Sequence, residues 1–172
     1  MRPPSRQRLG FLTEVSIIAV SAAHAQPVMP GRRAPEINLP TLAGERVKLS
    51  TLRGQPVIVS FWGTWCAPCR VEFPELVDVY VKHVERGLHV IAVNGRDQER
   101  STKDVQKFVN AFAVGFPVAL DRRGSVRRAY QIIGQPTTVF IDSNGIVQRF
   151  HTGLINRAEL DSGIALILPP SR

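Results

Sequence analysis

Residues 57–70 read VIVSFWGTWCAPCR, and this stretch decides the fold class. Its first six residues are largely apolar and rich in β-branched side chains, which is typical of a strand buried on both faces. Apolar residues then recur at helical spacing from Cys66 to Arg86, and Pro74 within this segment predicts a kink. A buried strand that runs directly into a helix is the opening of an α/β unit.

The rest of the chain continues this alternation. A weakly alternating segment, 36–49, predicts a small hairpin ahead of the first buried strand. The Asn144-Gly145 pair is a strong signal for a second hairpin near the C-terminus. This order predicts an α/β sandwich with parallel strands at its centre. The remaining strands are expected at 88–93, 116–120, 137–141 and 146–150, and the remaining helices at 102–112, 125–130 and 157–168.

Length and composition narrow the class of protein. The chain has 172 residues, a net charge of +8, 44% apolar residues and two cysteines. This length favours one domain with a sizeable core, and the apolar fraction excludes a disordered chain. Two cysteines are too few for a disulfide-rich scaffold. No run of eighteen apolar residues is present, so the sequence predicts no ordinary membrane span beyond the N-terminal region.

The first 25 residues have the pattern of an export signal. Arg2, Arg6 and Arg8 precede an apolar stretch, 9–23, which ends in the small-x-small sequence Ala23-His24-Ala25. Glu14 interrupts the apolar stretch and shortens its uncharged part. We therefore predict a cleaved signal peptide at 1–25 and a location in the periplasm or cell envelope. The alternatives are an uncleaved anchor, or a disordered tail that follows from a misassigned start codon.

The segment after the signal differs in composition from the domain that follows. Residues 26–35 contain three prolines and one glycine, which predicts a tether. The folded domain is expected to cover 36–172. Export would place both cysteines in an oxidising compartment, where a thiol pair is either reduced actively or remains a disulfide.

Both cysteines lie three residues apart between a buried strand and a helix. Cys66 is expected at or next to the helix N-terminus, where free N–H groups and the helix dipole stabilise a thiolate. Cys69 follows one helical turn later, within disulfide reach on the same face. Pro68 suits the first turn because its missing N–H has no intrahelical role there. This arrangement predicts a pair that alternates between dithiol and disulfide.

Three other interpretations of the pair were weighed. A structural disulfide that closes so short a loop constrains the unfolded chain very little. A zinc site needs four ligands, and the sequence has no second pair of suitable spacing, so no metal site is predicted. A copper-carrying dithiol stays open, because soft thiolates suit Cu(I). A lone C-x-x-C in an α/β pattern favours redox chemistry over all three.

Residues 61–70, FWGTWCAPCR, and 134–142, GQPTTVFID, resemble the two signature segments of the thioredoxin superfamily. More narrowly, the chain resembles exported thiol–disulfide proteins of the TlpA/ResA type. Residues 34–40 with 47–54 resemble the leading hairpin that this group shares with AhpC/TSA redoxins, and 116–121 resembles the segment inserted in the middle of the fold. The resemblance implies a thioredoxin-like three-layer α/β/α sandwich with an N-terminal β-hairpin extension and a central insertion.

The resemblance also assigns roles to individual residues. Cys66 corresponds to the attacking thiol and Cys69 to the resolving thiol. Pro136 corresponds to the proline that follows a cis peptide bond and lies against the cysteines, although an ordinary loop proline before a strand remains the alternative. Gln135 corresponds to the residue whose backbone pairs with an extended substrate chain. Trp62 and Trp65 are expected to flank the disulfide, with Trp65 in contact with substrate; the alternative for either is a place in the core or at the rim.

The chain departs from thioredoxin at one position. Ser60 stands where thioredoxin has a buried aspartate that relays protons to the second cysteine, and serine cannot ionise. In TlpA/ResA-like proteins an acid after the next strand often serves instead, and the matching residue is Asp97. We predict that Asp97 accepts the proton of Cys69 as a general base. The alternative is a solvated carboxylate in a charged loop.

The sequence therefore predicts an exported thiol–disulfide oxidoreductase that reduces disulfides of envelope proteins, such as apocytochrome c before haem attachment. Its partners would be disulfide-bearing exported proteins and a membrane electron donor, and it would need no cofactor. We expect a monomer that does not bind nucleic acid. Two other functions remain: a copper chaperone or thiol donor to a copper centre, and a thiol peroxidase of the AhpC/TSA type.

The basic cluster around 122–128 is interpreted as a solvated face rather than a docking patch.

Overall fold

The computed structural model describes residues 28–168, so the predicted signal peptide lies outside the described part of the chain. Each expected strand and helix is present with ends shifted by a few residues, and three short 3-10 helices are added. The strands are β1 (Asn38–Pro40), β2 (Arg46–Lys48), β3 (Val57–Trp62), β4 (His89–Asn94), β5 (Val118–Leu120), β6 (Thr137–Ile141) and β7 (Val147–Thr152). The α-helices are α1 (Ala67–His83), α2 (Thr102–Ala111), α3 (Ser125–Ala129) and α4 (Arg157–Ile167), and the 3-10 helices are η1 (Leu49–Leu52), η2 (Val84–Arg86) and η3 (Arg96–Gln98).

A five-stranded sheet with the order β5-β4-β3-β6-β7 forms the middle layer. β3, β4 and β5 are parallel, whereas β6 is antiparallel to β3 and to β7. The predicted parallel centre is therefore confirmed for three strands, and β6 and β7 form the predicted antiparallel hairpin. β1 and β2 pair only with each other in a separate two-stranded sheet.

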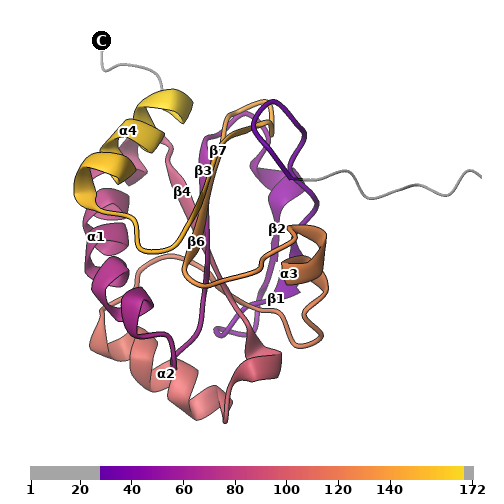
Figure 1. Ribbon diagram of the computed structural model, residues 1–172, viewed down its shortest axis with the longest axis vertical. Helices are drawn as coiled ribbons and strands as arrows, with labels where there is room; N and C mark the ends of the chain where they lie inside the picture. The colour runs from indigo at the N-terminus through magenta and orange to yellow at the C-terminus, as the bar shows by residue number, and fades with distance from the viewer. Residues whose placement is uncertain (1–27, 169–172) are drawn as a thin grey trace, which may run out of the picture.

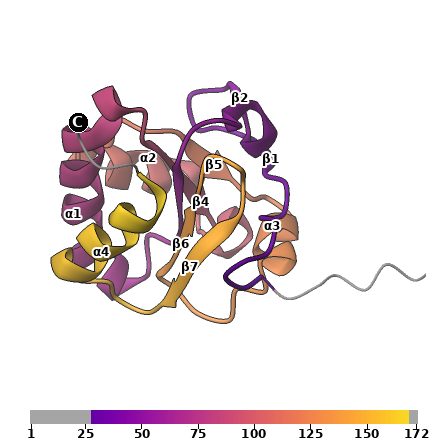
Figure 2. The ribbon, with the colours of Figure 1, turned by 90° about the horizontal axis from the view of Figure 1, so that it is seen from above.

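The helices are divided between the two faces of this sheet. The chain passes from β3 to its neighbour β4 and then, in the same direction across the sheet, to β5. Because both parallel connections are expected to be right-handed, α1 and α2 lie on the same face. α4 joins them there, while α3 and the β1–β2 hairpin cover the opposite face (Figures 1 and 2). The chain thus has the thioredoxin-like α/β/α arrangement with an added hairpin.

Alternating side chains of β3 divide the core into two clusters. Ile58 and Trp62 face α1, α2 and α4, whereas Val59 and Phe61 face α3 and the hairpin. Trp62 is completely buried, with its ring 4.6 Å from that of Phe73 and 4.6 Å from that of Phe108. Ser60 lies on the same face as Trp62 because side chains of a strand alternate, which points it towards α1.

The packed part of the chain begins earlier than the sequence indicates. Residues 31–34, assigned to a tether above, lie against the turn between β6 and β7. Gly31 N–H donates to the Val147 carbonyl at 2.8 Å, and Ala34 N–H donates to the Gly145 carbonyl at 3.0 Å. Ala34 is also buried. These backbone hydrogen bonds add residues before Glu36 to the folded domain.

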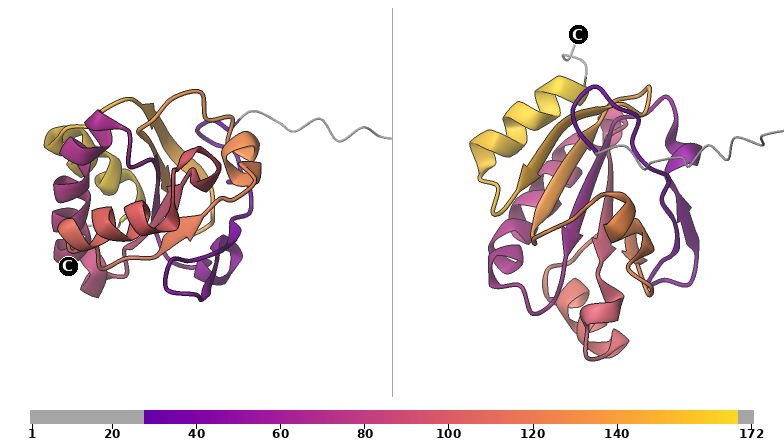
Figure 3. Two further views of the ribbon diagram at one scale, coloured as in Figure 1. Left: turned by 90° about the horizontal axis from the view of Figure 1, so that it is seen from below. Right: turned by 45° about the vertical axis from the view of Figure 1, so that its right-hand side comes forward.

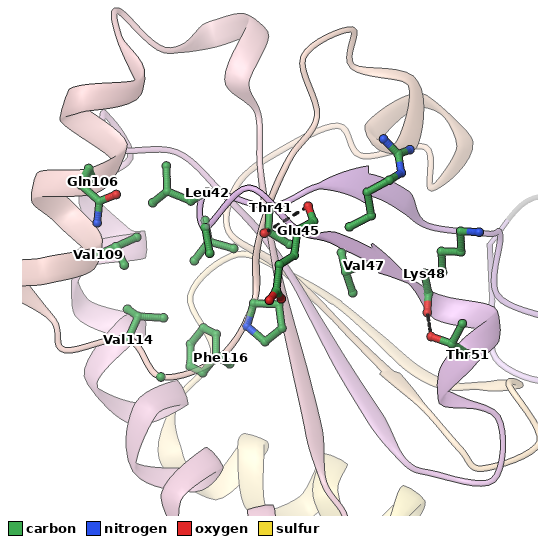
Figure 4. Close-up of a pocket in the computed structure, with 15 residues that line it drawn as sticks. Thr41, Leu42, Glu45, Val47, Lys48, Thr51, Gln106, Val109, Val114 and Phe116 are labelled. Carbon is green, nitrogen blue, oxygen red and sulfur yellow. Dashed lines mark hydrogen bonds between the residues drawn. The ribbon is translucent and has the colours of Figure 1, made fainter.

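A cavity of about 440 Å³ separates the hairpin from α2 and the segment that leads into β5. Figure 4 shows Leu42 and Val47 on one side of it and Val109, Val114 and Phe116 on the other. None of its lining residues belongs to the loop that carries the cysteines. Among residues 28–168, no helix is long and apolar enough to cross a membrane.

Candidate active site

Three loops meet at one edge of the central sheet. β3 and β4 run in parallel and end side by side, since Trp62 pairs with Asn94. β6 runs the other way and begins at the same edge, because Thr137 pairs with Phe61. The sheet therefore brings together the loop before α1, the loop after β4 and the loop before β6, which carry the site residues expected from the sequence.

Cys66 and Cys69 form a disulfide at the start of α1. Their sulfur atoms are 2.07 Å apart and their Cα atoms 5.3 Å apart, within the usual range for a disulfide. Cys66 is the N-cap residue, and its Sγ accepts the N–H of Cys69 at 3.2 Å. Cys66 retains 3% of its surface, whereas Cys69 retains none. The helix start thus directs a donor at the more exposed sulfur, which is the arrangement that stabilises an attacking thiolate.

The loop before β6 lies next to the disulfide loop. The Gln135–Pro136 peptide bond is cis, as the resemblance implies. A side chain added at Gly63 would meet the Trp65 indole at 2.7 Å and the Gln135 Oε1 at 3.1 Å, so these two side chains converge over Gly63. Trp65 is 55% exposed. The expected substrate-contacting residues, Trp65 and Gln135, are therefore close neighbours at the rim of the site.

A buried glutamate fixes the backbone just before the cysteines. Glu99 accepts the backbone N–H of Thr64 at 2.6 Å through Oε1 and the Thr64 hydroxyl through Oε2. The side-chain amide of Asn94, at the end of β4, donates to the same carboxylate at 2.9 Å. Glu99 is 9% exposed, so these contacts replace most of its water. This network ties the loop of Cys66 to the loop after β4.

Asp97 lies in η3, just after β4, where the sequence places it. Its Oδ2 accepts a hydrogen bond from Arg127 Nη2 at 2.9 Å, and its side chain is 28% exposed. The structure therefore adds an ion-pair partner from α3 that the sequence did not indicate. Proton transfer by Asp97 remains a prediction.

A second carboxylate, Glu72, lies deep inside the same region and was missed in the sequence. It is 1% exposed, and its Oε1 accepts the hydroxyls of Thr138 at 3.0 Å and Ser60 at 3.3 Å. Its Oε2 accepts the backbone N–H of Ile155 at 3.5 Å. Burial raises the pKa of Glu72 to about 7, and these three hydrogen bonds oppose the rise.

Glu72 lies next to Ser60, on the helix that carries Cys69. Glu72 follows Cys69 by three residues, so both side chains lie on one face of α1. The hydroxyl of Ser60 on β3 donates a hydrogen bond to the Glu72 carboxylate. A buried acid on the helix thus lies beside the strand position that carries the buried aspartate in thioredoxin. A charged residue on the apolar stripe of Cys69, Phe73 and Leu76 is the signal that could have found it.

Comparison with known proteins identifies the family of this chain. The AhpC/TSA family model matches residues 30–150. Thiol-disulfide oxidoreductase ResA of Bacillus subtilis is 34% identical over 95% of this chain and 96% of its own length, and ResA of Geobacillus kaustophilus is 35% identical over 92% and 84%. A solved thiol:disulfide interchange protein of the thioredoxin family from Chlorobium tepidum superposes with a TM-score of 0.70 and 26% identity, covering 81% of this chain and 97% of that one. The chain belongs to the AhpC/TSA family and is a thiol–disulfide oxidoreductase with a thioredoxin-like fold.

Proposed function

We propose that this enzyme is exported and reduces disulfides of proteins in the cell envelope through Cys66 and Cys69. The observation that carries the proposal is the disulfide at the start of α1, where Cys66 is the N-cap and the more exposed partner. Trp65 and Gln135 converge over Gly63, in the loop that leads to Cys66, and we infer that they offer a surface for an extended chain. Apocytochrome c, which bears its own cysteine pair before haem attachment, is a substrate of this kind.

The reaction transfers two electrons from the dithiol to the substrate. The Cys66 thiolate attacks one sulfur of the substrate disulfide, so a mixed disulfide forms and the other substrate sulfur leaves as a thiolate. The Cys69 thiolate then attacks Cys66 Sγ, which forms the Cys66–Cys69 disulfide and releases the second substrate sulfur. The substrate gains two electrons and two protons, and the enzyme is left oxidised. A dithiol electron donor at the membrane returns the enzyme to its reduced form.

The second step requires Cys69 to lose a proton away from water. An ionised sulfur is costly in such surroundings, so a nearby group has to accept the proton. We assign this role to Glu72, because its carboxylate is buried on the same helix face and burial raises its pKa to about 7. At neutral pH such a group exists in both protonation states, which suits a general base. Asp97 is the alternative acceptor and is tested separately below.

A disulfide-reduction assay tests the proposed activity. The full chain without residues 1–25, reduced beforehand and freed of reductant, should reduce an intermolecular disulfide such as that of insulin, with two thiols formed per enzyme dithiol. Cys66→Ser should abolish the reaction. Unchanged insulin after incubation with fully reduced enzyme would refute the proposal.

Export has its own test, since it rests on the arginines and the Ala23-His24-Ala25 sequence. Protein recovered from the cell envelope should begin at Gln26 if residues 1–25 are a cleaved signal. An intact N-terminus on envelope protein would indicate an anchor. An intact N-terminus on cytoplasmic protein would refute export altogether.

A further inference from the structure

A groove runs from the disulfide loop to α2. Its volume is about 610 Å³, which is large enough for several side chains of a bound peptide. Figure 3 (left) shows α2 lying across the end of the molecule that Figure 1 places at the bottom. We call this the α2 groove; it is lined by Thr64, Trp65, Arg70, Gln98, Glu99, Arg100, Asp104, Lys107, Phe108 and Ala111.

Three cations line the α2 groove, and two of them have no partner. Arg70 donates to the Thr64 carbonyl at 3.1 Å and lies over the Phe108 ring, 5.1 Å from its centre. Within residues 28–168, the side chains of Arg100 and Lys107 make no hydrogen bond or ion pair. Both are exposed residues. Their charges are therefore available to a ligand.

The two acids of the groove are already engaged. Glu99 is buried and accepts three hydrogen bonds from Thr64 and Asn94, as described above. Asp104 accepts the hydroxyl of Ser101, the N-cap residue of α2, at 2.8 Å. Neither acid forms an ion pair with the cations of the groove. The lining therefore carries three cations against two carboxylates, a net charge of +1, and its two charged side chains without a partner are both cations.

The α2 groove is connected to the reacting sulfur through Trp65. This indole lines the groove, and both it and the Gln135 side chain lie over Gly63, three residues before Cys66. Consider a polypeptide whose cysteine is bound to Cys66 and whose backbone pairs with the loop of Gln135. One end of this bound chain then runs past Trp65 towards α2. Each further extended residue adds about 3.3 Å, so two or three residues beyond the cysteine bring its side chains into the groove.

We propose that the α2 groove binds acidic residues that flank the cysteine of the polypeptide being reduced, with Arg100 and Lys107 as their ion-pair partners. The inference rests on the proposed reduction of protein disulfides and adds a preference among substrates. Complementary charge acts mainly on selection and on the rate of encounter, which suits an enzyme that has to find particular disulfides among many.

The test uses two disulfide-linked peptides that differ only in the second and third residues after the cysteine, Glu-Glu in one and Gln-Gln in the other. The measured quantity is the ratio of their kcat/KM values with the same enzyme. For the wild type at low ionic strength we expect a ratio of roughly five in favour of the acidic peptide, as for two exposed ion pairs. The ratio should fall towards one as salt is added.

Matched variants locate the preference. Arg100→Gln/Lys107→Gln should bring the ratio close to one, whereas Arg122→Gln/Arg123→Gln, which removes the same charge at the exposed start of the α3 segment, should keep the wild-type ratio. A wild-type ratio of one, or an equal fall in both variants, would overturn the α2 groove as the acidic subsite. If neither peptide is reduced by the wild type, the proposed function itself fails.

Discussion

Cys66 and Cys69 are separated by three residues, yet they face different surroundings. Cys66 retains 3% of its surface, with the exposed Trp65 beside it and the ion-paired Asp97 on the neighbouring loop. Cys69 is fully buried on the helix face that also carries Glu72. The outer side is suited to meeting a partner, and the inner side is suited to holding or accepting a proton. The difference indicates that attack and resolution are controlled by separate residues.

The largest expected effect comes from removing each sulfur in turn. Cys66→Ser should leave no measurable disulfide reduction, because the buried Cys69 cannot reach a substrate. Cys69→Ser should also stop turnover, but it should accumulate mixed disulfides between Cys66 and the substrate. Mass spectrometry of the trapped species, with and without reductant, distinguishes the two. Comparable trapping by both variants would show that the two sides are equivalent.

The next effect concerns stability, because Glu72 is buried with a raised pKa. In the unfolded chain this carboxyl has its ordinary pKa of 4.5, whereas in the folded protein burial raises its pKa to about 7. Below pH 4.5 it is protonated in both states. As the pH rises from about 4.5 to about 7, only the unfolded state releases the proton, so folding stability falls by about 3 kcal/mol. Above pH 7 the loss is complete.

Glu72→Gln removes this titration and keeps a hydrogen-bonding side chain. The difference in free energy of unfolding, wild type minus variant, should therefore decrease by about 3 kcal/mol between pH 4 and pH 8. Denaturant titrations of the oxidised proteins at several pH values measure it, and the other ionisable groups cancel in the difference. A difference that does not change with pH would mean that Glu72 titrates alike in both states.

The outer and inner sides of the site also differ in how well the sequence predicts them. The strand Val57–Trp62 and the cysteine pair identify the fold and the outer side, because a buried strand, a helix start and a C-x-x-C motif are local patterns. The inner side depends on tertiary contacts. The sequence shows Glu72 only as a charge on the apolar stripe of the helix, and the fold brings Thr138, 66 residues away, to its carboxylate.

The N-terminal segment also depends on contacts that are distant in the chain. Prolines and a glycine at 26–35 favour a tether by composition. The N–H groups of Gly31 and Ala34 donate to carbonyls of Val147 and Gly145, more than a hundred residues later in the chain. No local sequence pattern predicts these hydrogen bonds. Local rules therefore predict elements and motifs well and miss side chains or segments whose partners are distant in the chain.

The effect of Glu72 on the rate of the resolving step is expected to be smaller than its effect on folding stability. Glu72→Gln should slow the resolving step by roughly ten- to a hundredfold, which is typical of the loss of a general base. Attack by Cys66 should keep its rate, so stopped-flow measurements should show the mixed disulfide forming normally and decaying slowly. The wild-type resolving rate should increase as the pH rises through about 7, and the variant should lack this increase. A slower attack with normal resolution would remove Glu72 from this role.

The smallest effect is expected at Asp97, and it decides between the two carboxylates. Asp97 is partly exposed and paired with Arg127, and it lies on the loop after β4 rather than on the helix face that carries Cys69. If Glu72 accepts the proton, Asp97→Asn should change the rate of insulin reduction by less than about threefold, the scale of one exposed ion pair. The sequence-based expectation is the opposite, a loss of roughly ten- to a hundredfold as for a general base. Measuring Asp97→Asn and Arg127→Gln together from pH 6 to 9 separates the two: a loss confined to Asp97→Asn would make Asp97 the acceptor, and a small loss shared by both variants would leave the proton with Glu72.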